Sequence, residues 1–218
     1  MIQPMTKTNA EFAVWKTIKL GVGPRSGEGL LRAILAAGFD EDAGNASSCL
    51  KRHFAPHPKE EEVDLVALEM HQVGYFPSGI RANDLTARAV ELDGIYRWAE
   101  HVGLDLCPME VGPQLRLAYK NQPMSEDVLI AMEPLALSTR TRDQIFVVWH
   151  GLGWDSSKQS RTRVTKALDL THATPFRYWS ESSCIPGCER LPGMPETTGG
   201  RLDTRRMMVF VKPRKQEQ

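Results

Sequence analysis

Five polar residues in one part of the chain have side chains that could bind an anion or transfer a proton. They are Glu110, Gln114, Arg116, Gln122 and Glu133. An arginine guanidinium can hold a carboxylate or a phosphate through two parallel hydrogen bonds, and carboxylates beside it could act as general acid and base. The sequence supplies no nucleophile for them and does not fix the distance between the carboxylates. We therefore expect a ligand-binding site here, and whether it is catalytic stays open.

A β-sheet is expected to position these side chains. Residues 114–119 alternate between polar and apolar types, which is typical of a strand with one buried face. Arg116 then lies opposite the aliphatic face, together with Glu133 from a second expected strand over 128–133. A cross-strand ion pair between these two residues is the structural alternative to a ligand site.

Cysteine and histidine side chains offer a second kind of chemistry, metal binding. Cys49, His53 and His57 recur at intervals of four residues, and Cys184 and Cys188 lie further along the chain. These are donor types that zinc takes in a tetrahedral site, but structural zinc sites usually have paired cysteines at closer spacing. Prolines also interrupt the helix that would align the first three residues. We therefore expect a polar loop and a tight turn, with no metal and no cofactor, and keep these five residues as the weak metal candidates.

The histidines give no recognisable catalytic motif. The sequence has neither a G-x-S-x-G nucleophile elbow nor an H-E-x-x-H zinc motif. His71 and His150 each follow an expected strand, a place where catalytic side chains often lie. A partly buried residue that makes structural hydrogen bonds is the more common outcome for a single histidine at such a place.

Charge is unevenly distributed along the chain. Lysine plus arginine and aspartate plus glutamate number 27 each, yet residues 156–218 carry a net charge of +6 and the preceding residues a net charge of −6. Opposite charges of this kind favour docking of the two parts on each other. They also leave open a polyanion or a nucleic acid as a partner of residues 156–218.

Composition and length are those of one ordinary globular domain. The chain has 218 residues, of which 41% are hydrophobic and 25% charged. No apolar run is long enough to span a bilayer, and the first residues lack the pattern of a signal peptide. Four scattered cysteines do not form the framework of a disulfide-rich secreted protein. We expect a cytoplasmic protein with reduced thiols and no membrane partner.

Hydrophobic periodicity predicts an α+β fold, a mostly antiparallel sheet with helices packed on one face. Strands are expected at 12–20, 63–70, 114–119, 128–133, 145–149 and 207–211, the third to fifth as a meander. Helices are expected at 26–38, from about 83 to 94, and at 96–101. Residues 40–59 are expected to be irregular, and 164–170 have a weak helical pattern.

These elements divide the chain into four parts. Residues 1–11 are an N-terminal tail, and residues 12–154 form the α+β core domain. Residues 155–206 are rich in small, polar and basic residues, which predicts a long polar excursion before the last strand. Residues 207–218 supply the final core strand and a basic tail.

One motif resembles a known family. Residues 107–117 read C-P-x-E-V-G-P-Q-L-R-L, and together with 12–21, 130–134 and 209–211 they resemble a small bacterial protein family described only as hypothetical. The resemblance covers most of residues 12–150 and the last strand. It implies a shared architecture and carries no assigned activity, cofactor or substrate.

Two classes of function fit these observations. The first is a cytoplasmic, non-enzymatic binding or regulatory domain that uses the polar strand face of Arg116 and its neighbours. The alternative is a hydrolase or nuclease acting on a phosphate-containing or nucleic-acid substrate, with Glu110 and Glu133 as acid–base or metal-binding groups and Arg116 stabilising negative charge. An enzyme should bring these side chains together in a concave pocket, whereas a binding domain should spread them over a face or pair them with each other.

Overall fold

The computed structural model describes residues 11–41, 45–69, 92–135, 144–155, 160–172 and 205–214. These residues form one sheet and four helices, so the predicted α+β class with a mostly antiparallel sheet is confirmed. Within the same residues, no helix has both the length and the apolar character needed to cross a membrane.

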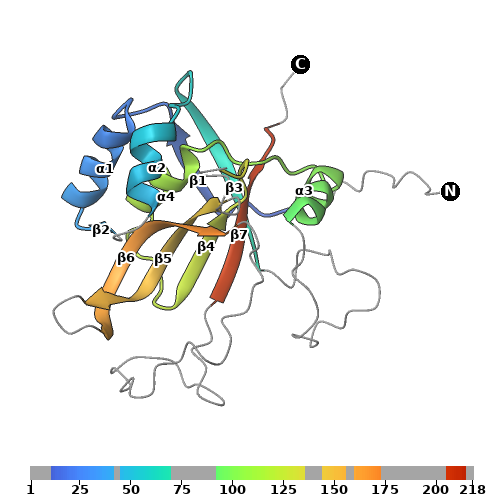
Figure 1. The fold of residues 1–218 in the computed structure, drawn as a ribbon. Helices are drawn as coiled ribbons and strands as arrows, with labels where there is room; N and C mark the ends of the chain where they lie inside the picture. Colours follow the sequence, from blue (N-terminus) through green and yellow to red (C-terminus); the bar gives the residue numbers. More distant parts are fainter. Residues whose placement is uncertain are drawn as a thin grey trace, which may run out of the picture.

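The sheet has seven strands in the order β1-β3-β7-β4-β5-β6-β2. Their bounds are β1 (Lys16–Leu20), β2 (Asp40–Glu41), β3 (Glu61–Glu69), β4 (Glu126–Ile130), β5 (Gln144–Asp155), β6 (Ser160–His172) and β7 (Arg205–Lys212). Neighbours are antiparallel except for the pairs β4–β7 and β2–β6, which are parallel. Strand β7 therefore lies between β3 and β4 in the interior of the sheet (Figure 1).

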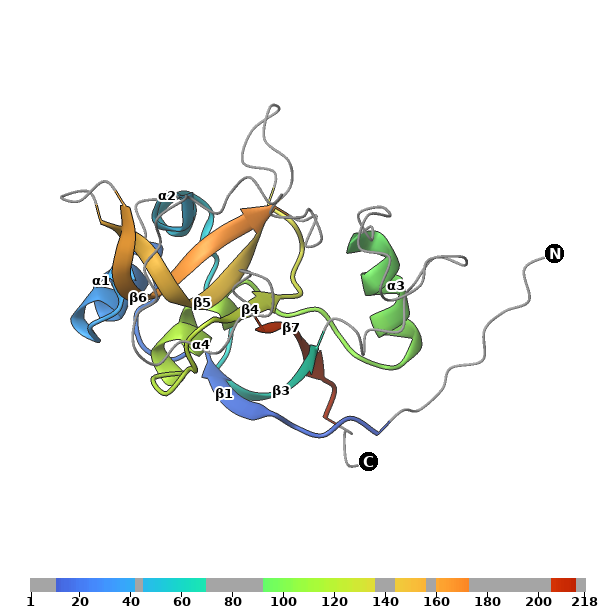
Figure 2. The ribbon, with the colours of Figure 1, turned by 90° about the horizontal axis from the view of Figure 1, so that it is seen from below.

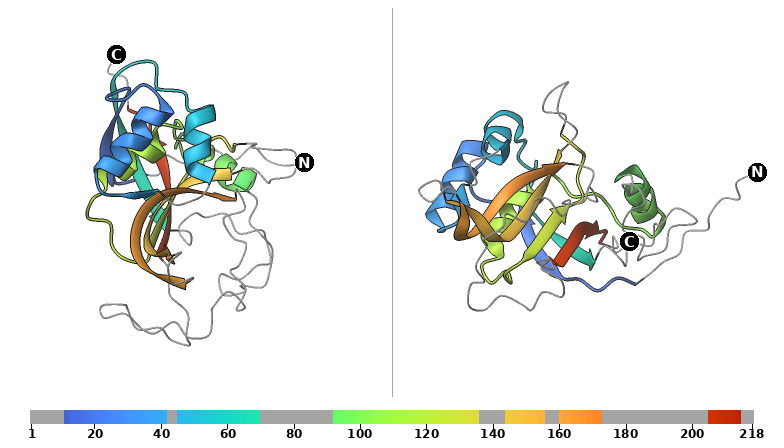
Figure 3. Two further views of the ribbon diagram at one scale, coloured as in Figure 1. Left: turned by 60° about the vertical axis from the view of Figure 1, so that its left-hand side comes forward. Right: turned by 60° about the horizontal axis from the view of Figure 1, so that its bottom comes forward.

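Three of the four helices gather on one side of the sheet. These are α1 (Gly27–Ala36), α2 (Asn45–His53) and α4 (Val111–Ala118), which lie together beside β5 and β6 (Figures 1 and 3). Helix α3 (Leu92–His101) stands apart from them, next to β7 (Figure 2). Its Trp98 ring meets the Phe210 ring of β7 edge to face, with the ring centres 6.4 Å apart.

Helix α1 begins and ends where the sequence predicts. The Ser26 side chain accepts a hydrogen bond from the Gly29 backbone N–H at 3.1 Å, which satisfies one of the unpaired donors of the first turn. Leu30, Leu31 and Ile34 form its buried face. Gly38 follows the helix with φ of +82°, a conformation that glycine adopts without strain.

The expected strands other than 114–119 are confirmed as β1, β3, β4, β5 and β7, with shifted ends. Their apolar side chains build the core. Val128, Ile130, Phe146, Val148 and Phe210 are fully buried. The central strands carry apolar side chains at almost every position because both faces of the sheet are covered there.

The strand expected at 114–119 is wrong, because these residues belong to α4 and the turn after it. Val111, Leu115 and Tyr119 are all buried and lie four positions apart, which is the spacing of one helix face. Six residues of alternation are too few to distinguish a strand from this pattern. Pro113 is tolerated because it lies in the first helical turn, where a missing backbone N–H costs no helical hydrogen bond. The expected meander is therefore wrong too, since β4 has β5 and β7 as its neighbours.

Three further expectations need correction. Helix α2 lies within residues 40–59, which were expected to be irregular, and it ends before Pro56. Gly94 lies inside α3 instead of ending a helix. Residues 164–170, with their weak helical pattern, belong to β6, so the described beginning of the 155–206 excursion is part of the sheet. Residues 1–10 of the expected tail, the helix start at 83 and residues 173–204, with Cys184 and Cys188, lie outside the described residues.

Candidate functional site

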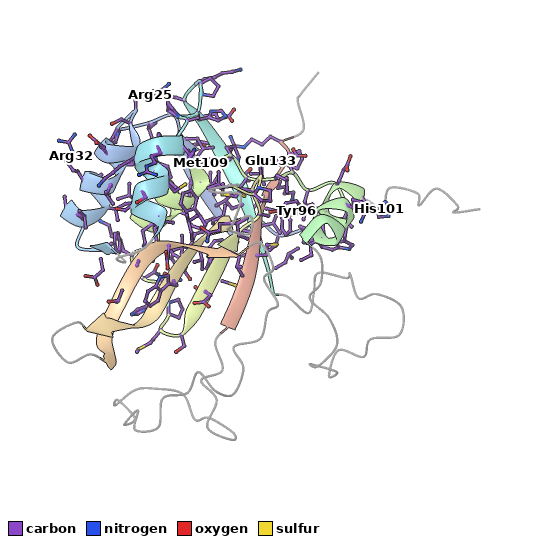
Figure 4. All side chains as sticks on the ribbon, viewed as in Figure 1. Arg25, Arg32, Tyr96, His101, Met109 and Glu133 are labelled. Carbon is purple, nitrogen blue, oxygen red and sulfur yellow. The ribbon has the colours of Figure 1, made fainter. Side chains whose placement is uncertain are left out.

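The structure separates the five residues that the sequence placed in one site. Glu110 and Gln114 form one partly buried cluster, and Arg116 and Gln122 form a second, fully buried one. Glu133 is exposed and follows the end of β4, on the side of the molecule near Tyr96 of α3 (Figure 4). Since Arg116 is completely buried, the expected ion pair with Glu133 on a shared strand face does not form.

The Glu110 carboxylate holds two chain segments against the start of α4. It accepts hydrogen bonds from the backbone N–H of Gly21 at 3.0 Å and of His57 at 2.6 Å, and from the Gln114 amide at 2.9 Å. Only 2% of Glu110 is exposed. Gly21 has φ of +71°, and a Cβ atom there would lie 2.2 Å from the Lys59 carbonyl oxygen, so this close approach requires glycine. Glu110 therefore organises the backbone and is shielded from solvent.

Arg116 and Gln122 belong to a buried network, which we call the Arg116 network. The Arg116 guanidinium donates to Gln122 Oε1 at 2.5 Å, to the Tyr119 carbonyl, and at 3.4 Å to the Trp149 carbonyl. It also lies over the Phe39 ring, 4.3 Å from the ring centre. In the described part of the chain these partners are all neutral, and Arg116 Nε has none. Burial lowers the pKa of Arg116 to about 10, which still leaves the guanidinium charged at neutral pH.

Gln122 connects the Arg116 network to two strands. Its side-chain amide donates to the carbonyls of Glu126 in β4 and Val148 in β5, at 3.0 Å each. Its own backbone carbonyl lies 2.8 Å from His150 Nδ1. Because a carbonyl only accepts hydrogen bonds, the hydrogen of the His150 ring must be on Nδ1 in this contact. The Arg116 network thus fixes the orientation of His150.

His150 lies at the edge of a depression of about 360 Å³ on the helix side of the sheet. We call it the basic depression. It is lined by Ala37, Gly38, Phe39, Asp40, Lys120, His150, Val164 and Lys166. The residues come from the segment between α1 and β2, from the start of β2, from the turn after α4 and from the paired strands β5 and β6. The geometry therefore brings together basic side chains that are up to 46 positions apart in the sequence.

The charges of the basic depression are mainly positive. His150 and Lys166 are direct partners in the β5–β6 register, and the Lys166 ammonium donates to the Lys120 carbonyl at 2.5 Å. Asp40 supplies the carboxylate among the lining residues, and it accepts a hydrogen bond from the Thr165 hydroxyl at 2.9 Å. The lining thus includes two lysines and a histidine but one carboxylate, which already has a partner. Such an arrangement can bind an anion.

The metal candidates do not converge in the described part of the chain, which holds no group of three or more His, Cys, Asp or Glu side chains arranged to hold a metal ion. Cys49 is buried in α2, and burial raises the pKa of its thiol to about 11. His57 Nε2 lies 3.1 Å from Glu61 Oε1, and its Nδ1 lies 2.9 Å from the Lys59 carbonyl. Cys49, His53 and His57 thus give no metal site among these residues.

Sequence reasoning missed Lys120 and Lys166 and treated His150 as an isolated residue. The strand register between β5 and β6 is what places His150 beside Lys166, and residues 164–170 gave a helical pattern instead. A search for basic residues opposite one another in antiparallel strands would have paired these two once β6 was recognised as a strand. Lys120 follows a helix that was itself expected to be a strand.

Comparison with known proteins gives no relative on which to base a function. No protein-family model, no curated protein and no solved structure matches the chain. The resemblance of residues 107–117 to a bacterial family stays a prediction, and the functional argument depends on the geometry above.

Proposed function

We propose that the protein is a non-enzymatic binding domain whose ligand is a small anion held in the basic depression. The observation that carries this proposal is the convergence of Lys120, His150 and Lys166 on one depression from three different elements. Positive charges that line the same depression repel each other, and a bound anion relieves that repulsion. The volume of about 360 Å³ is near the lower end of the range for small-molecule pockets.

The buried polar residues support this surface instead of binding the ligand themselves. The Arg116 network holds His150 through Gln122, and the Arg116 guanidinium covers one face of Phe39, which lines the depression. A side chain locked by such contacts keeps its geometry when a ligand arrives, which reduces the entropy lost on binding. This arrangement gives the predicted ligand-binding residues Arg116 and Gln122 a positioning role.

The alternative function, a hydrolase or nuclease, has less support from the positions of the residues that it requires. It assigns acid–base or metal-binding roles to Glu110 and Glu133 and the stabilisation of negative charge to Arg116. Glu110 accepts hydrogen bonds within its own cluster, and Arg116 donates its hydrogen bonds within the Arg116 network. Glu133 belongs to neither group and is exposed. Acid–base catalysis needs its groups within reach of the same reacting atoms. These positions support binding over hydrolysis.

The test is anion binding by the full chain. We expect inorganic phosphate and sulfate to bind the wild-type protein, measured by isothermal titration calorimetry and by the rise in melting temperature. The double variant Lys120→Gln/Lys166→Gln should lose at least about tenfold in affinity, since it removes both ammonium groups. Lys19→Gln/Lys51→Gln is the control, because it removes the same charge at two exposed lysines that do not line the depression. Equal loss in both variants would contradict the proposed site.

A further inference from the structure

The hydrogen-bonding pattern of the basic depression indicates which anion it fits. His150 donates from Nδ1 to the Gln122 carbonyl, so Nε2 carries a lone pair and accepts hydrogen bonds while the ring is neutral. His150 lines the depression, and Nε2 is the ring nitrogen that this contact leaves for a ligand. The two lysines offer only donors. A matching ligand therefore combines negatively charged oxygens with one hydroxyl hydrogen.

We infer that the ligand of the basic depression is a phosphate monoester of a small aliphatic molecule, an inference that rests on the proposed function. Phosphate monoesters lose their second proton near pH 6, so both the singly and the doubly charged forms are present around neutral pH. The singly charged form donates its P–OH to His150 Nε2 and accepts hydrogen bonds from Lys120 and Lys166. Carboxylates, sulfate and phosphodiesters carry no such hydrogen at neutral pH.

The walls of the depression favour an aliphatic group over a nucleobase. Stacking of a base needs an exposed aromatic face, but Phe39 is only 7% exposed and Arg116 covers one side of its ring. Val164, in contrast, is 49% exposed, and Ala37 also lines the depression. Two small apolar side chains can bury a short carbon chain next to the phosphate. The ester part of the ligand is therefore non-aromatic.

The experiment compares four probes on the full chain by calorimetry at about pH 7, where an ordinary histidine ring is mostly neutral and both forms of a phosphate monoester are still present. The probes are inorganic phosphate, glycerol 2-phosphate, sulfate and a single-stranded oligonucleotide. We expect glycerol 2-phosphate to bind at least about threefold tighter than inorganic phosphate. Inorganic phosphate should bind about tenfold tighter than sulfate, which corresponds to a difference in binding free energy of about 1.4 kcal/mol. Glycerol 2-phosphate no tighter than inorganic phosphate would overturn the assignment of an ester. Tightest binding of the oligonucleotide would replace the inference with a nucleic-acid partner.

His150→Asn separates this inference from the proposed function. An asparagine amide can still donate to the Gln122 carbonyl, but it lacks the acceptor at the Nε2 position. We expect the variant to bind sulfate within about twofold of wild type and to lose its preference for phosphate over sulfate. If His150→Asn retains the preference for phosphate over sulfate, the inference about the ligand is wrong, whereas the proposed anion binding still holds. Absence of binding by every probe to the wild type would instead overturn the proposed function.

The hydrogen position on His150 can be measured independently of any ligand. Nitrogen chemical shifts of the labelled imidazole distinguish a ring with hydrogen on Nδ1 from one with hydrogen on Nε2. We expect the Nδ1 form in the neutral ring of the wild-type protein. The Nε2 form would remove the acceptor on which the choice of a phosphate monoester depends.

Discussion

The hydrogen bonds of Gln122 predict a large loss of stability in Gln122→Leu. This substitution removes the charge-assisted hydrogen bond from Arg116, which is worth about 1.5–3 kcal/mol, and leaves the carbonyls of Glu126 and Val148 without their donor, at about 1 kcal/mol each. The free energy of unfolding should therefore fall by about 4 kcal/mol. With a urea m-value of about 2 kcal/mol/M, the unfolding midpoint should drop by about 2 M.

A double-mutant cycle isolates the reason for this loss. Arg116→Met alone removes the buried cation and leaves Gln122 Oε1 without its donor, at a cost of about 2 kcal/mol. When both side chains are replaced, no buried charge lacks a partner. The double variant should then be more stable than the sum of the single effects by about 1–2 kcal/mol.

Gln114→Leu is the matched control for this cycle. Gln114, on α4, also has a side-chain amide, but its partners, Glu110 and the Val22 carbonyl, belong to the other cluster. Its effect should add to that of Arg116→Met within about 0.5 kcal/mol. Two results would refute the reasoning that the buried Arg116 charge depends on the Gln122 amide. One is that the effects of Gln122→Leu and Arg116→Met are additive as well, and the other is a loss below about 1 kcal/mol for Gln122→Leu.

Three further predictions concern stability and reactivity. Gly112→Ala should destabilise the protein by about 1–3 kcal/mol in urea unfolding, because a Cβ atom there would lie 2.9 Å from the Phe146 ring. Cys49 and Cys107 should escape alkylation in the native protein and react after unfolding, as peptide mapping would show, since burial raises the pKa of both thiols. The hydrogen bonds from Arg214 lower the pKa of Asp64 in the folded protein below its ordinary value of about 3.9. The small stabilising effect of this pair is therefore present at pH values above the ordinary pKa, and it is lost as the pH falls through the lowered pKa of the folded protein. The melting temperatures of wild type and Arg214→Gln should accordingly differ at neutral pH and converge in acid; a difference that persists in acid would exclude this origin.

Local signals in the sequence were sufficient for much of the fold. Ser26 and Gly38 mark the ends of α1 because a side-chain cap and a left-handed glycine act within a few residues of their own positions. The apolar strands β3, β5 and β7 were recognisable because they are buried on both sides, which leaves continuous hydrophobic runs. Helix α4 was missed since the decisive spacing extends from Val111 to Tyr119, beyond the six residues that seemed to alternate.

The candidate site was less predictable because it depends on contacts between distant parts of the chain. Arg116 was recognised as unusual, but its place in the core depends on Gln122, Trp149 and Phe39, which come from different elements. Nothing near Lys166 in the sequence indicates that it faces His150; only the pairing of β5 with β6 does so. Charged residues were therefore identifiable as candidates, whereas their grouping required the strand register.

The position of β7 in the sheet has a consequence for how the protein is made. Strand β7 separates β3 from β4, and its parallel partner β4 ends 75 positions before β7 begins. Until Arg205–Lys212 has left the ribosome, the facing edges of β3 and β4 have no partner strand between them. Pairing across such a sequence separation is slow and leaves a half-built sheet open to aggregation. During synthesis, the nascent chain should therefore be most prone to aggregation until β7 closes the gap.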